Sequence, residues 1–176
     1  MKTLGGTVFI DGKPEHAEAV RADVVYEIDH RTIAFAARVY PAVTRTALFV
    51  VFFWFGIVKL MGHSEAAGLA LALATKTVGA SHFHMMFDTL AVAECVIGIL
   101  CLIPQAVRLV VAMLFVHMTI VCAPLVLVPE LTWQRVLVPT LIGQYIIKNV
   151  LVIAAAFGLL AHASPLDGTA VARPAE

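Results

Sequence analysis

The chain has 176 residues, of which 61% are hydrophobic and 14% are charged, and its formal net charge is zero. Soluble domains average about 45–50% apolar and about 25% charged residues, so this composition, with a mean hydropathy of +0.93, predicts an integral membrane protein. The zero net charge excludes a general basic field for nucleic acid.

The first segment, residues 1–41, is polar and is predicted to be a cytoplasmic segment ahead of the membrane domain. It has no short apolar stretch with a cleavage site, so no signal peptide is expected. Its VFIDGK stretch holds an Asp-Gly turn signal. Further on, Val25, Ile28, Phe35 and Val39 are interleaved with charges, which indicates an interfacial helix that leads into the first span.

Four apolar runs follow, at residues 42–62, 85–104, 106–129 and 138–161. Each reaches the ~20 residues needed to cross a bilayer core, and lipid admits no open backbone, so the runs are expected to be helices. The fold class is therefore all-α: a polytopic four-transmembrane-helix bundle over residues 42–162, followed by a flexible tail, residues 163–176. Pro124 lies inside the third run and predicts a kink or an early end.

The loop between the first two spans contains EAAGLALALATKTVGAS, which is too short and too mildly apolar to span. Two arrangements stay open for it: a helix along the membrane surface, or a re-entrant helix.

Lys and Arg residues in the flanks set the orientation. Most fall on one side of a four-span topology: Lys2, Lys13, Arg21, Arg31, Arg38, Arg45, Arg108 and Arg173. The other side has Lys76 and Arg135. We therefore expect both termini in the cytoplasm and a multi-pass protein of the bacterial inner membrane.

Four ionisable residues lie inside the runs, away from their first few positions, namely Lys59, Glu94, His117 and Lys148. Such residues usually face the interior and mark function. At ~1.5 Å per residue, Glu94, His117 and Lys148 each lie roughly 12–15 Å deep, near the midplane. Lys59 lies within one turn of the outer end, so it is expected to snorkel.

The simplest electrostatic solution pairs Glu94 with Lys148 and keeps His117 close by. Small residues on both sides of Glu94, Ala91 and Gly98, would let another helix approach closely. The fourth span gathers Gln144, Tyr145, Lys148 and Asn149 on one side. Two interpretations stay open: an ion pair that fixes helix register, or a pocket that handles a quinone, a substrate or a proton.

Three stretches resemble the DoxX-like family of small bacterial membrane proteins: ALFVVFFWFGIVKLMG, AECVIGIL and PTLIGQYIIKNVLVIAAA. The G-x-x-K of the first span, the Glu of the second and G-Q-Y-I-I-K-N of the fourth carry the resemblance. It covers residues 45–160 and singles out Gly56, Lys59, Glu94, Gln144, Lys148 and Asn149. The family takes its name from the small subunit of a thiosulfate:quinone oxidoreductase. The resemblance implies a four-helix membrane protein associated with a membrane oxidoreductase.

Metal and haem sites are the alternatives for bound cofactors. His63, His82, His84 and Asp88 lie on the expected outer face, where imidazoles with carboxylates or nearby methionines suit zinc or copper. A haem needs an axial ligand that faces the interior near the centre of the bundle, and His117 is the one histidine expected near the midplane of the bilayer. The three cysteines form no C-x-x-C and are expected to be buried apolar residues.

The leading hypothesis is a membrane subunit or partner of a redox, quinone-linked system. The chain has neither a Gly-rich dinucleotide motif nor a cysteine cluster for iron–sulfur, so whether it is itself an enzyme stays open. One alternative is a small proton or solute transporter, for which a homo-oligomer is expected. The other is a structural assembly protein. The predicted partners are the lipid bilayer, a membrane oxidoreductase and further copies of the chain.

Overall fold

The structure is a computed structural model, and it describes residues 14–163. The chain divides into two compact units, residues 1–40 and 41–176, and each is described by itself. The rest of the predicted tail after Ala163 lies outside the described residues, as do residues 1–13 with their VFIDGK turn.

The described part of the first unit is helical and belongs to α1 (Pro14–Leu60). Arg31 donates from Nε to a carboxylate oxygen of Glu27 at 2.6 Å, one helical turn away. Val25, Ile28 and Phe35 are exposed on this helix, so the segment is the helix that their spacing indicates.

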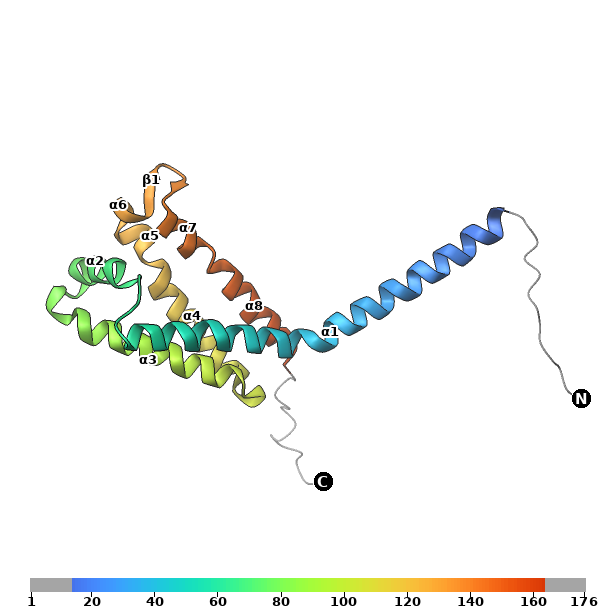
Figure 1. The fold of residues 1–176 in the computed structure, drawn as a ribbon, viewed down its shortest axis with the longest axis horizontal. Coiled ribbons are helices and arrows are strands. Elements are labelled where there is room, and N and C mark those ends of the chain that lie inside the picture. The colour runs from blue at the N-terminus through green and yellow to red at the C-terminus, as the bar shows by residue number, and fades with distance from the viewer. Residues whose placement is uncertain (1–13, 164–176) are drawn as a thin grey trace, which may run out of the picture. The chain divides into compact units, whose positions relative to one another are not determined.

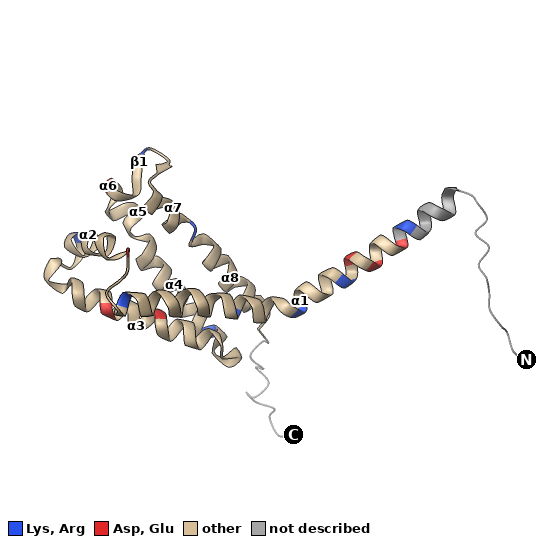
Figure 2. Ribbon diagram, in the orientation of Figure 1, with Lys and Arg blue, Asp and Glu red and all other residues tan. Residues whose placement is uncertain are grey.

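Among the described residues, four helical stretches are long and apolar enough to cross a membrane: residues 23–60, 80–101, 104–127 and 141–161. They contain α1, α3 (Phe83–Cys101), α4 (Val107–Cys122) and the pair α7 (Leu141–Ile147) and α8 (Val150–Ala161). This confirms the four predicted helices and a membrane-spanning protein. Figure 2 shows few charged residues along α3, α4 and α8, and more on the N-terminal part of α1.

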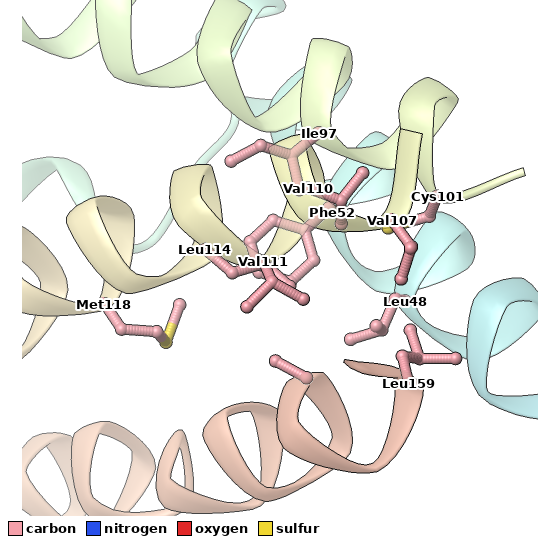
Figure 3. Close-up of a cluster of buried hydrophobic side chains, with 11 residues drawn as sticks. Leu48, Phe52, Ile97, Cys101, Val107, Val110, Val111, Leu114, Met118 and Leu159 are labelled. Atoms are coloured by element: carbon pink, nitrogen blue, oxygen red, sulfur yellow. The ribbon is translucent and has the colours of Figure 1, made fainter. Parts of the chain in front are cut away.

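An apolar core joins α1, α3, α4 and α8, as Figure 3 shows. Its side chains are almost fully buried, and most are branched; the others are one aromatic ring, two sulfur-containing side chains and one alanine. They are Leu48, Phe52, Ile97, Cys101, Val107, Val110, Val111, Leu114, Met118, Ala156 and Leu159. Near this core, Arg45 donates to the carbonyl of Ile103, at the end of α3.

Two glycines bring α1 and α3 into close contact. A Cβ at Gly98 would lie 2.8 Å from the backbone N of Phe53, and a Cβ at Gly56 would lie 2.6 Å from Sγ of Cys95. A side chain larger than hydrogen would not fit at either position, which explains why both residues are glycine. The predicted close approach at Gly98 is confirmed, and the approaching helix is α1.

The connection between α1 and α3 contains α2 (Ala67–Thr77) and the short 3₁₀ turn η1 (Ala80–His82). The loop stretch therefore forms a helix, as expected. Lys76 in its last turn forms an ion pair with Glu130 at 2.5 Å. In Figure 1, α2 and the segment that holds Glu130 lie at the same end of the second unit.

The third span ends in short elements. After η2 (Pro104–Ala106) and α4, the chain continues through α5 (Pro124–Leu127), α6 (Pro129–Thr132), β1 (Trp133–Arg135) and β2 (Val138–Pro139). The two strands pair antiparallel. Since α4 ends at Cys122 and α5 begins at Pro124, the predicted helix break at Pro124 is confirmed.

Candidate functional site

Three polar side chains from three helices meet in the interior, and we refer to Lys59, Glu94 and His117 as the triad. Nζ of Lys59 on α1 donates to Oε2 of Glu94 on α3 at 2.5 Å. Nε2 of His117 on α4 lies 3.2 Å from Oε1 of the same carboxylate. Both oxygens of Glu94 are therefore engaged, each by a different helix.

The triad is buried, with exposed side-chain fractions of 10% for Lys59, 7% for Glu94 and 4% for His117. The Phe52 ring packs against the His117 imidazole, edge to face, with centroids 5.5 Å apart. An ion pair at this depth is weakly screened, and each group would be costly to bury without the others. The three side chains therefore behave as one electrostatic unit.

The predicted partner of Glu94 is wrong: the carboxylate pairs with Lys59 and not with Lys148. None of the ion pairs within residues 14–163 includes Lys148. Its ammonium lies over the ring of Tyr145 at 4.9 Å from the centroid. The expected snorkelling of Lys59 is also wrong, because its amine turns to the carboxylate in the interior.

The triad lines a large cleft of about 1680 Å³. Its walls come from α1, the loop at 61–66, α2, α3, α4, α5, α7 and α8. Most of the lining side chains are apolar, including Phe55, Leu90 and Val116. Ligand pockets commonly measure about 300–1,000 Å³, so this cleft has room for a long amphiphilic molecule.

Polar residues reach the cleft at two further places. His63, Ser64, Glu65 and His82 line it at the α2 end, where the chain connects α1 to α3. Tyr145, Lys148 and Asn149 line it from the fourth span. Gln144 is exposed and absent from this lining, and its carbonyl accepts the Lys148 backbone N–H.

The apolar core closes the cleft on the side away from α2. Phe52, Ile97 and Met118 belong both to the core and to the cleft lining. Beyond them the core is packed with buried branched side chains such as Val110 and Leu114 (Figure 3). Access to the triad is therefore by way of the cleft.

The outer histidines do not assemble into the metal site considered from the sequence. Within the described residues, no three His, Cys, Asp or Glu side chains gather as metal ligands. His63 and His82 line the cleft, whereas His84 stacks edge-on against Phe83 and Asp88 is exposed. A haem ligand role for His117 would have to use its Nδ1, because Nε2 contacts Glu94.

Outside the spans, Lys76 holds the pKa of Glu130 below its ordinary range, chiefly by the hydrogen bond between the two side chains. This ion pair joins α2 to α6, the short helix that contains Glu130.

Comparisons with protein-family profiles, with curated proteins and with solved structures found no match. The proposed function therefore rests on the geometry of the triad and the cleft. Sequence reasoning identified all three members of the triad but missed how Lys59 joins them. The G-x-x-K spacing was a signal for it, since it puts Gly56 at the close contact and Lys59 one turn further along the same helix.

Proposed function

We propose that this protein is a membrane subunit, or a membrane partner, of a quinone-linked redox system, and that the cleft binds the quinone. The observation that carries the proposal is a buried Lys–Glu–His triad that lines a large apolar cleft. An apolar cavity with a few convergent polar groups is the usual form of a small-molecule site.

The apolar walls suit the tail and ring faces of a quinone. Most cleft residues within α1, α3, α4 and α7 are aliphatic, aromatic or methionine side chains. Burying an apolar chain against such a surface stabilises the complex by about 25 cal/mol per Å² of area removed from water. A quinone with an isoprenoid tail fits the volume and the character of this cleft.

The triad suits the redox-active carbonyl. An ammonium group has three N–H donors, and the ion pair of Lys59 with Glu94 uses one of them, so a quinone carbonyl oxygen can accept another. Reduction of a quinone consumes two electrons and two protons. Glu94 and His117 supply a place where a proton is held next to the ring, while the electrons come from a reduced centre in the partner oxidoreductase.

The resemblance to the DoxX-like family agrees with this proposal. Its motif positions Lys59 and Glu94 belong to the triad, and Lys148 and Asn149 line the cleft. With it we propose a four-helix bundle in a bacterial inner membrane, both termini in the cytoplasm, and α2 at the outer surface or re-entrant. The α2 end of the cleft would then face outward.

The test is quinone binding by the whole protein in nanodiscs. Ala93 lines the cleft, so Ala93→Trp should fill it and abolish binding of decylubiquinone. Ala154 on α8 is exposed and does not line the cleft, so Ala154→Trp is the matched control and should bind like the wild type. Equal binding by all three proteins, or binding by none, contradicts the proposal.

A second candidate, proton translocation, is favoured by the chain of titratable groups from His117 through Glu94 to Lys59. Intramembrane carboxylates and histidines of this kind form proton relays in pumps and transporters. Proton flux in liposomes that Glu94→Gln abolishes, without any quinone binding, would favour this function. If neither flux nor binding is found, the triad has the packing role of a structural assembly protein.

A further inference from the structure

Among the spanning helices, Lys148 is the charged residue of the cleft that does not belong to the triad. It lies in the fourth span, roughly 10 Å along the helix axis from Leu141 and roughly 20 Å from Ala161. Its ammonium contacts the Tyr145 ring, and both residues line the cleft together with Asn149. A cation at this depth is costly and usually has a specific counter-group.

The charges of the cleft do not balance within the spans. The charged residues that line it there are Lys59, Glu94 and Lys148, while Glu65 lines it outside the spans, in the loop at 61–66. Lys59 and Glu94 form an ion pair with each other, which leaves the positive charge of Lys148. No ion pair within residues 14–163 compensates it.

The helix tightens at the same place. α7 ends at Ile147 and α8 begins at Val150, and Lys148 and Asn149 between them keep right-handed helical backbone angles. The Asn149 and Leu151 N–H groups bond to carbonyls three residues back, as in a 3₁₀ turn. A stretch of 3₁₀ inside a helix often marks a functional hinge or a sequence under strain. Here the tightened turn contains two consecutive polar residues, Lys148 and Asn149, that line the cleft.

We propose that Lys148, with Tyr145 and Asn149, forms an anion-binding site on the wall of the cleft that the fourth span provides. The ligand of the cleft is then an amphiphile with one negative charge. The ammonium pairs with the charge, and the tyrosine hydroxyl and asparagine amide are further hydrogen-bond donors. This deepens the proposed function, because it specifies the charge of the ligand. An ionised quinol and a fatty-acid carboxylate share this chemistry.

The experiment compares paired ligands that are similar in size and differ chiefly in charge, with the full chain in nanodiscs of zwitterionic phosphatidylcholine. One pair is 2-hydroxy-1,4-naphthoquinone, an anion at neutral pH, and the neutral 2-methoxy-1,4-naphthoquinone. The other pair is dodecanoate and dodecanol. Affinities are measured for the wild type, Lys148→Gln, the charge-conserving Lys148→Arg, and Lys76→Gln, which removes a cation outside the cleft.

The wild type should bind the anionic naphthoquinone about tenfold more tightly than the neutral one, as expected for one ion pair in a partly screened site. Lys148→Gln should erase the preference, and Lys148→Arg and Lys76→Gln should keep it. Equal affinities in the wild type, a preference that survives Lys148→Gln, or an equal loss in Lys76→Gln overturns the inference.

The second ligand pair separates the source of the anion from the proposed function. If neither naphthoquinone binds, the quinone proposal fails. A preference for dodecanoate over dodecanol that depends on Lys148 then still supports the anion-binding site, with a fatty-acid-like ligand. If that preference is also absent, the inference of an anion-binding site is overturned as well.

Discussion

The partner of Glu94 can be tested by a double-mutant cycle. The side chains of Lys59 and Glu94 are 10% and 7% exposed and lie 2.5 Å apart, and removing one partner of a buried ion pair typically costs about 3–5 kcal/mol. Lys59→Met and Glu94→Gln should each lower the free energy of unfolding by about that amount. The double variant leaves no unpaired charge, so the two effects should not add, with a coupling energy of about 2–3 kcal/mol.

The matched control is Lys148→Met, which removes the lysine that the sequence suggested as the partner. Its effect should add to that of Glu94→Gln within about 0.5 kcal/mol, because the two residues do not interact directly. Unfolding by SDS in mixed micelles, followed by the fluorescence of Trp54 and Trp133, measures all of these variants. Coupling of Glu94 to Lys148 and not to Lys59 would refute the arrangement of the triad.

Two further predictions concern packing and the α2 connection. Gly98→Ala should destabilise the protein by about 1–3 kcal/mol by overpacking, because the new Cβ meets Phe53 at 2.8–2.9 Å. Gly68→Ala in α2 meets nothing within 4 Å and should be neutral or slightly stabilising; equal losses in the same unfolding assay would contradict the close contact. The folded-state pKa of Glu130 lies below its ordinary 4.5, so the stability that it contributes is present above pH 4.5 and is lost as the pH falls through the lower value. Lys76→Gln should raise the pKa of Glu130 in a ¹³C-carboxyl NMR titration, and an unchanged pKa would show that the pair does not form.

Much of the fold follows from the sequence because apolar run length and proline position are local signals. The four spans and the break at Pro124 depend only on the composition of each segment. The same holds for the inward position of Glu94 and His117, since charges inside a span avoid lipid. Local signals therefore identified the elements and the inward position of two of the three triad residues.

The pairing of Glu94 was not predictable in the same way, because depth was counted along each span separately. That count placed Lys59 near the surface and Lys148 at the midplane. Which lysine reaches the carboxylate depends on which helix packs against α3, and the small Gly98 marks a close approach without identifying the helix. The tertiary contacts of Gly98 with Phe53 and of Gly56 with Cys95 show that the helix is α1.

The 3₁₀-like turn at Lys148 has a related explanation. Tyr145, Lys148 and Asn149 lie in an apolar stretch with no proline or glycine between them, so the sequence predicts a regular helix. The tightened turn accompanies the exposure of these side chains to a cleft that several distant segments build together. A cavity of this kind is a property of the whole packing and leaves no local pattern.

The central claim is that a quinone carbonyl binds next to the triad, and infrared spectroscopy of carbonyl-¹³C-labelled decylubiquinone in nanodiscs tests it most directly. A hydrogen bond from Lys59 should lower one carbonyl stretching frequency relative to the quinone in empty nanodiscs. The shift should disappear in the Lys59→Met/Glu94→Gln double variant, whose charges remain balanced, and persist in His84→Ala, which removes a histidine outside the cleft. An unshifted carbonyl in the wild type, or a shift that the double variant retains, would contradict the account.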